Sequence, residues 1–146
     1  MIERGIYPYL IPIARTIAGF VVGVMLGIVG GWTATTFNAM IGYPWLPEVH
    51  RNIYIVGIGL GGGLGAYFGW MSFNIRWYLI AGMILLVLGG GIAGAYLGME
   101  YGQVADPSYL GRRYTIDSMM HWGAAIGGIA VASALGMFHY VRNLGR

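Results

Sequence analysis

The middle of the chain holds two long apolar segments with almost nothing between them. Ile53–Phe73 and Trp77–Met99 contain no charged residue, and only Asn74, Ile75 and Arg76 separate them. A helix of roughly 20 apolar residues crosses the hydrocarbon core of a bilayer, which is about 30 Å thick. Because so short a connection leaves the two helices only an antiparallel arrangement, the sequence predicts a transmembrane hairpin.

The composition of the whole chain agrees with a membrane protein. Of the 146 residues, 58% are hydrophobic and 9% are charged, whereas about 25% of the residues in a typical soluble domain are charged. The net charge of +3 comes from arginines scattered at segment ends, which favours interfacial anchoring over nucleic-acid binding. The chain has no cysteine, which excludes thiolate metal sites, iron–sulfur clusters and covalent c-type haem.

Two further apolar stretches complete an all-α, four-span bundle that forms a single membrane domain over residues 1–146. The predicted spans cover about residues 10–32, 53–73, 77–99 and 119–141. We expect residues 33–52 to form a loop, with Tyr43–Pro47 lying in the membrane interface. All tryptophans fall near span ends, as in the aromatic belts of membrane proteins: Trp32, Trp45, Trp70, Trp77 and Trp122.

The arginines predict the orientation of this polytopic protein. An even number of spans places both termini on one side of the membrane. That side carries five arginines and one glutamate, and the other side carries three arginines and four acidic residues. The excess of positive charge predicts that both termini are cytoplasmic.

Glycine recurs at every fourth position within the spans. Four residues make slightly more than one helical turn, so each series forms a groove in which helix backbones can approach closely. Four spans with such a series predict a compact bundle with glycine-lined (GxxxG-type) helix-packing seams. The series are Gly19, Gly23, Gly27 and Gly31; Gly57, Gly61, Gly65 and Gly69; Gly90, Gly94 and Gly98; and Ala124, Gly128, Ala132 and Gly136.

An internal duplication is a further hypothesis. Ile17-Ala18-Gly19 recurs 63 positions later as Ile80-Ala81-Gly82. At the same offset, Gly61 and Gly65 fall on Ala124 and Gly128. The chain would then be a duplicated two-helix hairpin whose halves are related by an axis along the membrane normal.

Two histidines are the candidate cofactor ligands, although nothing in the sequence requires a cofactor. His50 precedes the second span and His121 begins the fourth, so both are expected near the same membrane face. Two histidines on facing helices can ligate haem. His121 alone, followed by the small residues Gly123–Ala125, is also a candidate ligand for the magnesium of a chlorophyll-type pigment.

The most polar group of residues is predicted to lie in the third loop. Arg112, Arg113 and Asp117 form a candidate docking loop, with an anionic headgroup or substrate as the alternative ligand. No cluster of His, Asp and Glu has metal-ligand spacing, and no nucleophile triad is visible. The sequence therefore predicts a protein that is not an enzyme and holds no metal.

Three functions remain as hypotheses. The first is a non-catalytic structural or assembly subunit of a larger membrane complex, respiratory or photosynthetic complexes among them, with other membrane-protein subunits and the lipid bilayer as partners. The second is a small homo-oligomeric channel or carrier, which needs a polar lining. The third is a haem- or pigment-binding membrane protein that uses His121.

Overall fold

The protein is all-helical. The computed structural model describes residues 7–41, 47–70, 76–107 and 110–144. They form four helices, α1 (Tyr7–Ile41), α2 (Pro47–Trp70), α3 (Trp77–Val104) and α4 (Arg112–Leu144). Each helix is long enough and apolar enough to cross a membrane.

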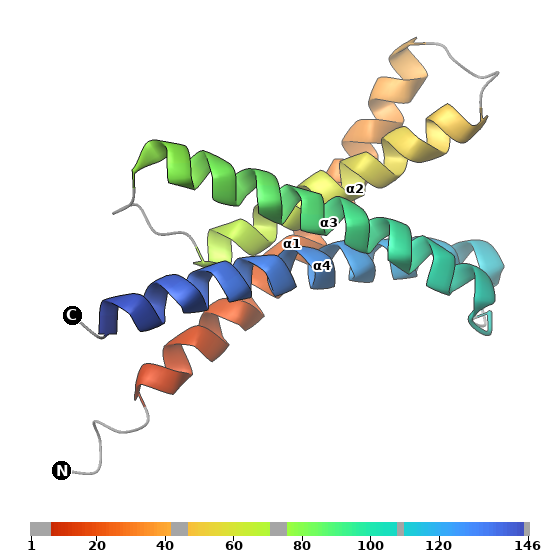
Figure 1. Ribbon diagram of the computed structural model, residues 1–146. Coiled ribbons are helices and arrows are strands. Elements are labelled where there is room, and N and C mark those ends of the chain that lie inside the picture. Colours follow the sequence, from red (N-terminus) through yellow and green to blue (C-terminus); the bar gives the residue numbers. More distant parts are fainter. Residues whose placement is uncertain (1–6, 42–46, 71–75, 108–109, 145–146) are drawn as a thin grey trace.

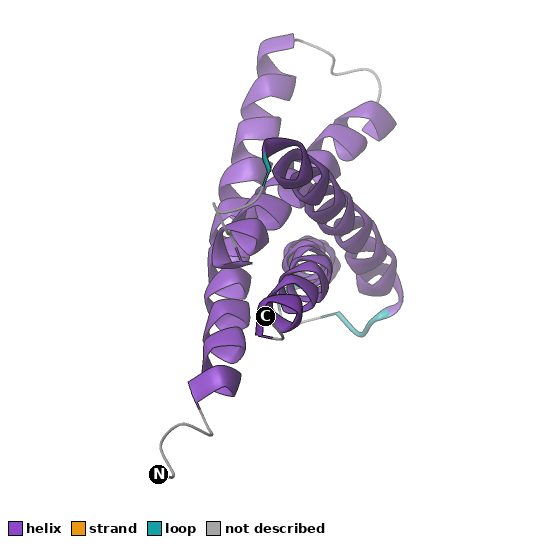
Figure 2. Cartoon of the chain, turned by 60° about the vertical axis from the view of Figure 1, so that its left-hand side comes forward, coloured by secondary structure: helices purple, strands orange, loops and turns teal. Residues whose placement is uncertain are grey.

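The helices pair as two antiparallel hairpins that cross each other. Figure 1 shows α1 running beside α2 and α3 beside α4, and the two pairs form an X with both chain termini at the same end. In Figure 2 the view runs nearly along α4, which lies between α1 and α3. Among the described residues, α1 and α3 make no contact, whereas α2 and α4 each contact all three other helices.

The core is therefore built around α2. In its most apolar window 56% of the residues are buried, against 17% in α1 and 22% in α3. One group of buried side chains surrounds Ile55 and Ile58, and a second surrounds Tyr67 and Trp70. The outer faces of α1 and α3 are correspondingly exposed, which is the arrangement that a lipid surrounding accommodates.

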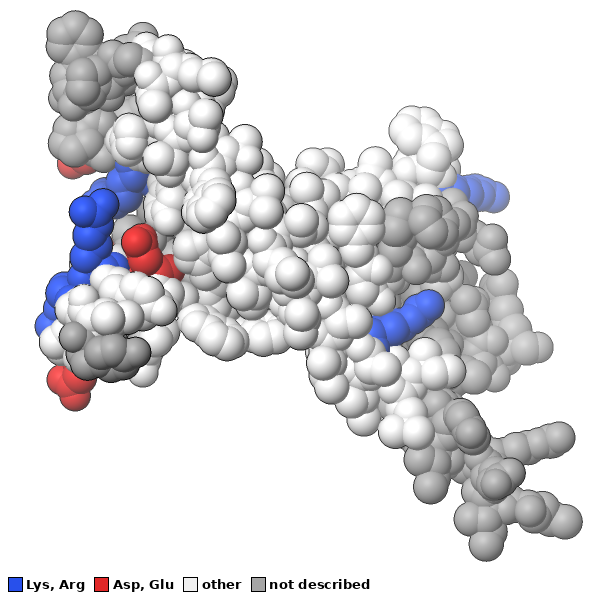
Figure 3. All heavy atoms as spheres, turned by 180° about the vertical axis from the view of Figure 1, so that it is seen from behind, with Lys and Arg blue, Asp and Glu red and all other residues white. Residues whose placement is uncertain are grey.

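Charge is confined to the ends of the helices. Figure 3 shows a wide band without charged side chains between two charged ends. The described acidic residues all lie at the end that contains the α1–α2 and α3–α4 connections: Glu48, Glu100, Asp106 and Asp117. A central apolar band with charge at both ends is the pattern expected of membrane-spanning helices.

Two helix boundaries correct the sequence-based prediction. The segment predicted as a loop, residues 33–52, is helical over most of its length, because α1 continues to Ile41 and α2 begins at Pro47. In this segment Thr33, Thr35 and Thr36 each donate a hydrogen bond to the carbonyl four residues earlier, at 2.8–3.0 Å, so their hydroxyls are satisfied within the helix. Most of the expected interfacial segment, residues 43–46, lies outside the described residues.

The 63-residue offset does not hold through the second helix of each hairpin. Gly61 packs on α1, its hairpin partner, whereas Ala124 packs on Gly62 of the other hairpin. The residues of α4 that pack on its own partner, α3, are instead Gly123 and Gly127. Exchanging the two hairpins nevertheless leaves the pattern of helix contacts unchanged, and the duplication stays a hypothesis.

Candidate functional site

The two candidate ligand histidines, His121 and His50, have different surroundings in the structure. His121 Nδ1 lies 2.8 Å from the backbone carbonyl oxygen of Asp117, one turn earlier in α4. Its imidazole and the ring of Tyr54 form an edge-to-face pair with a centroid distance of 6.4 Å. His50 is exposed in the first turns of α2, and its backbone carbonyl accepts a hydrogen bond from Asn38 at 3.3 Å.

The predicted docking loop is in fact part of a helix. Arg112, Arg113 and Asp117 lie in the first turns of α4, because the helix begins directly after Gly111, whose φ of 97° suits glycine. The guanidinium of Arg112 donates to the carbonyl oxygens of Gln103 and Ala105, at 2.9 and 2.5 Å. It thus satisfies carbonyls that the end of α3 leaves without a helical partner.

Polar contacts at this end of the molecule join the helices. Tyr96 of α3 donates its hydroxyl to Asn52 Oδ1 of α2 at 2.8 Å. The contacts of Asn38 with His50 and of Tyr54 with His121 join α2 to α1 and to α4. The polar residues at this end therefore hold helices together.

The predicted glycine series of α1 and α2 face each other. A methyl group added to Gly65 would lie 2.5 Å from Gly23 Cα, and one added to Gly69 would lie 2.5 Å from Gly19 Cα. One added to Gly61 would overlap the carbonyl of Leu26, and one added to Gly57 would lie 2.5 Å from Ala34 Cβ. Gly27 approaches α2 less closely, and Gly31 meets the side chains of Tyr54 and Ile58.

The series of α3 and α4 do not face each other. A methyl group on Gly90, Gly94 or Gly98 would strike a backbone carbonyl of α4, but the residues opposite are Gly127, Gly123 and Met119. The predicted α4 series lies on another face of that helix. Ala124 and Gly128 contact α2, Ala132 belongs to the buried group around Trp70, and Gly136 lies against the Trp70 indole.

Sequence reasoning missed the close contacts that lie outside the four-residue series. Gly123 and Gly127 are themselves four residues apart, so the same periodicity signal was present in α4. Gly59 and Gly63 contact α3 at Ile92 and Leu88. Sequence reasoning also did not identify two buried polar atoms, the Tyr67 hydroxyl and the Trp70 indole N–H, which find no hydrogen-bond partner among the described residues.

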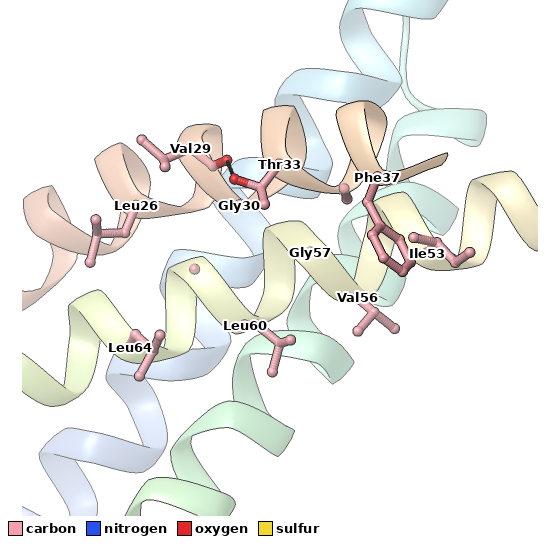
Figure 4. A pocket seen from close by; sticks show the side chains of 12 residues that line it. Leu26, Val29, Gly30, Thr33, Phe37, Ile53, Val56, Gly57, Leu60 and Leu64 are labelled. Carbon is pink, nitrogen blue, oxygen red and sulfur yellow. Dashed lines mark hydrogen bonds between the residues drawn. The ribbon is translucent and has the colours of Figure 1, made fainter. Parts of the chain in front are cut away.

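An apolar groove lies between α1 and α2, with a volume of about 430 Å³. Figure 4 shows Leu26, Val29, Thr33 and Phe37 along the α1 side of this groove, and Ile53, Val56, Leu60 and Leu64 along the α2 side. Gly30, Gly57 and Gly61 also line it. Neither this groove nor a smaller cavity of about 300 Å³ beside Thr16 and Met137 is lined by His50 or His121.

Within the described residues, no three His, Cys, Asp or Glu side chains could jointly hold a metal ion. No family model matches the chain, and searches of curated proteins and of solved structures find no match. Function is therefore inferred from the geometry of the chain itself.

Proposed function

We propose that this protein is a non-catalytic assembly subunit of a larger membrane complex, and that the outer face of α3 receives a helix of another subunit. We further propose that the glycine series act as membrane helix-packing seams and that both termini are cytoplasmic. The proposal rests on two runs of three glycines, Gly61–Gly63 in α2 and Gly89–Gly91 in α3, and on which neighbouring helix each glycine faces.

The run in α2 makes one contact on each of its three sides. Gly61 meets α1 at Leu26, Gly62 meets α4 at Ala124, and Gly63 meets α3 at Leu88. Each of these glycines therefore lies where another helix comes too close for a side chain. Three successive residues of a helix point in directions about 100° apart, so one run serves three neighbouring helices.

The run in α3 has the same form but one side without a neighbour. Gly90 meets α4 at Gly127 and Gly91 meets α2 at Gly59, whereas no described residue lies within 4 Å of a methyl group on Gly89. Gly82, two turns earlier, is also open. A glycine inside a helix costs about 0.5–1 kcal/mol relative to alanine. A close-packed partner helix supplies the reason for glycine at Gly89.

The surface around Gly89 has the character of such an interface. Leu85, Leu86 and Leu97 on α3 are 70%, 58% and 71% exposed, and no charged residue lies between Trp77 and Met99. Small residues that let backbones approach, flanked by large apolar side chains, are typical of helix contacts in membranes.

The proposal is tested by extracting the tagged full-length chain from its native membrane in mild detergent. Particle mass, co-purifying chains and the visible spectrum are then recorded. We expect other subunits to co-purify, and Gly89→Leu to release them without lowering the thermal unfolding temperature of the chain. Leu85→Ile is the conservative control on the same helix.

A wild-type particle that contains only this chain would contradict the proposal. So would a Gly89→Leu variant that keeps its partners. The channel hypothesis and the pigment hypothesis then become the next to examine, by flux measurements and by the effect of His121→Leu on any visible absorption.

A further inference from the structure

We propose that the groove between α1 and α2 binds one acyl chain of a phospholipid. All residues that line it come from these two helices, and α1 does not contact α3 within the described residues. The groove therefore opens to the surroundings of the bundle. This inference goes beyond the proposed assembly role and does not depend on it.

The length and depth of the groove match one leaflet of a bilayer. On α2 it runs from Ile53 to Leu64, which is about 16 Å at 1.5 Å per residue. Half of a hydrocarbon core is about 15 Å. Along α2 (Pro47–Trp70) the groove begins at Ile53, just past Arg51 at the charged end, and ends at Leu64, in the second half of the helix. A partner helix would need a contact surface through both leaflets, whereas a lipid tail needs one.

The chemistry of the walls suits a hydrocarbon chain. Among the described residues that line the groove, only Thr33 has a polar side chain, and its hydroxyl donates to the Val29 carbonyl at 2.8 Å. No side-chain polar group in the groove is therefore left without a hydrogen bond, and an apolar occupant incurs no desolvation penalty there. A volume of about 430 Å³ lies within the range of small-molecule sites, about 300–1,000 Å³.

The charged residues of α2 do not line the groove. Glu48 and Arg51 are exposed in the first turns of α2, but each is turned about 150° around the helix from the lining residues Ile53, Leu60 and Leu64. The proposed site therefore recognises the acyl chain and not the headgroup.

Photolabelling separates a bound chain from ordinary surrounding lipid. The full-length protein is reconstituted alone in phosphatidylcholine vesicles that contain phosphatidylcholine with a photoactivatable diazirine on one acyl chain. Labelled peptides are then quantified by mass spectrometry. Leu60 and Leu64 are each 38% exposed, whereas Leu85 and Leu97 on α3 are 70% and 71% exposed. Surrounding lipid would therefore label α3 more strongly, and a bound chain would reverse this order.

We expect several-fold more label at Leu60 and Leu64 than at Leu85 and Leu97. Filling the groove with Val29→Phe, or separately with Leu60→Phe, should remove this excess, whereas Leu85→Phe should leave it unchanged. Helix content by circular dichroism checks that each variant is folded.

If Leu85 and Leu97, the more exposed residues, carry more label than Leu60 and Leu64, the groove is not a lipid site. An excess of label that survives both Val29→Phe and Leu60→Phe would overturn the lipid site as well. Because no other protein is present, these outcomes leave the proposed assembly role untouched, and a failure of that role leaves them untouched.

Discussion

Gly61 and Gly89 are the same residue type inside long apolar helices, yet their surroundings are opposite. A methyl group on Gly61 would overlap the carbonyl of Leu26, whereas a methyl group on Gly89 would meet nothing within 4 Å in the described part of the chain. Gly61→Ala should therefore destabilise the isolated chain by about 1–3 kcal/mol, because backbones at this crossing must move apart. Gly89→Ala should stabilise it slightly, by less than about 1 kcal/mol, through helix propensity alone.

Thermal unfolding of both variants in the same detergent, followed by circular dichroism, measures this difference. Gly82→Ala is a second open-site control. If Gly61→Ala and Gly89→Ala unfold together, close backbone approach at Gly61 is not a determinant of stability.

For single residues, the sequence predicts which glycines share a face of a helix, but it does not predict which neighbouring helix that face contacts. The spacing of Gly57, Gly61 and Gly65 could be predicted to mark a contact face, since a four-residue period keeps residues on one side of a helix. The identity of the opposite helix depends on how far each helix is rotated about its axis. For that reason the face of α4 that meets α3, at Gly123 and Gly127, was missed.

At the level of the helices, Arg112 was expected in a loop, but it belongs to α4 and caps the end of α3. Arg112, in the first turn of α4, donates to the carbonyls of Gln103 and Ala105. Arg112→Gln removes the charge that favours a helix C-terminus and leaves these carbonyls unsatisfied. We expect the last turn of α3 to lose about 1–2 kcal/mol of local stability.

Hydrogen–deuterium exchange of the amides near residues 100–106 reports this local change. Arg113→Gln is the matched control, because it removes the same charge one position later. Equal exchange in the two variants would show that the hydrogen bonds of Arg112 do not hold this helix end.

Helix boundaries were the elements that the sequence predicted least well, for a physical reason. An apolar run reports the thickness of the bilayer core, not the length of the helix that crosses it. With 35 residues, α1 is about 52 Å long and extends well past a core of about 30 Å. In the sequence the threonines after Trp32 indicate a loop, but the hydroxyl of each one donates a hydrogen bond to a backbone carbonyl of α1.

For the whole molecule, the two crossing hairpins predict that the chain can be assembled from two pieces. The hairpins are joined by one short connection between Trp70 and Trp77, while α2 contacts both α3 and α4. A methyl group on Gly63 would lie 2.9 Å from Leu88 Cα, and one on Gly62 would lie 2.9 Å from Ala124 Cβ. These close contacts cross between the hairpins and do not need a covalent link.

Two co-expressed halves, residues 1–73 and 74–146, should therefore co-purify when only one carries a tag. Gly63→Leu in the first half should abolish this association, because the leucine side chain would clash with the backbone of α3 at Leu88. Within lipid, no hydrophobic force compensates for the lost packing. Gly89→Leu in the second half is the control, since its side chain would point away from the other hairpin. Association that survives Gly63→Leu would mean that contacts elsewhere join the hairpins, and that the crossing at α2 is not what determines the four-helix fold.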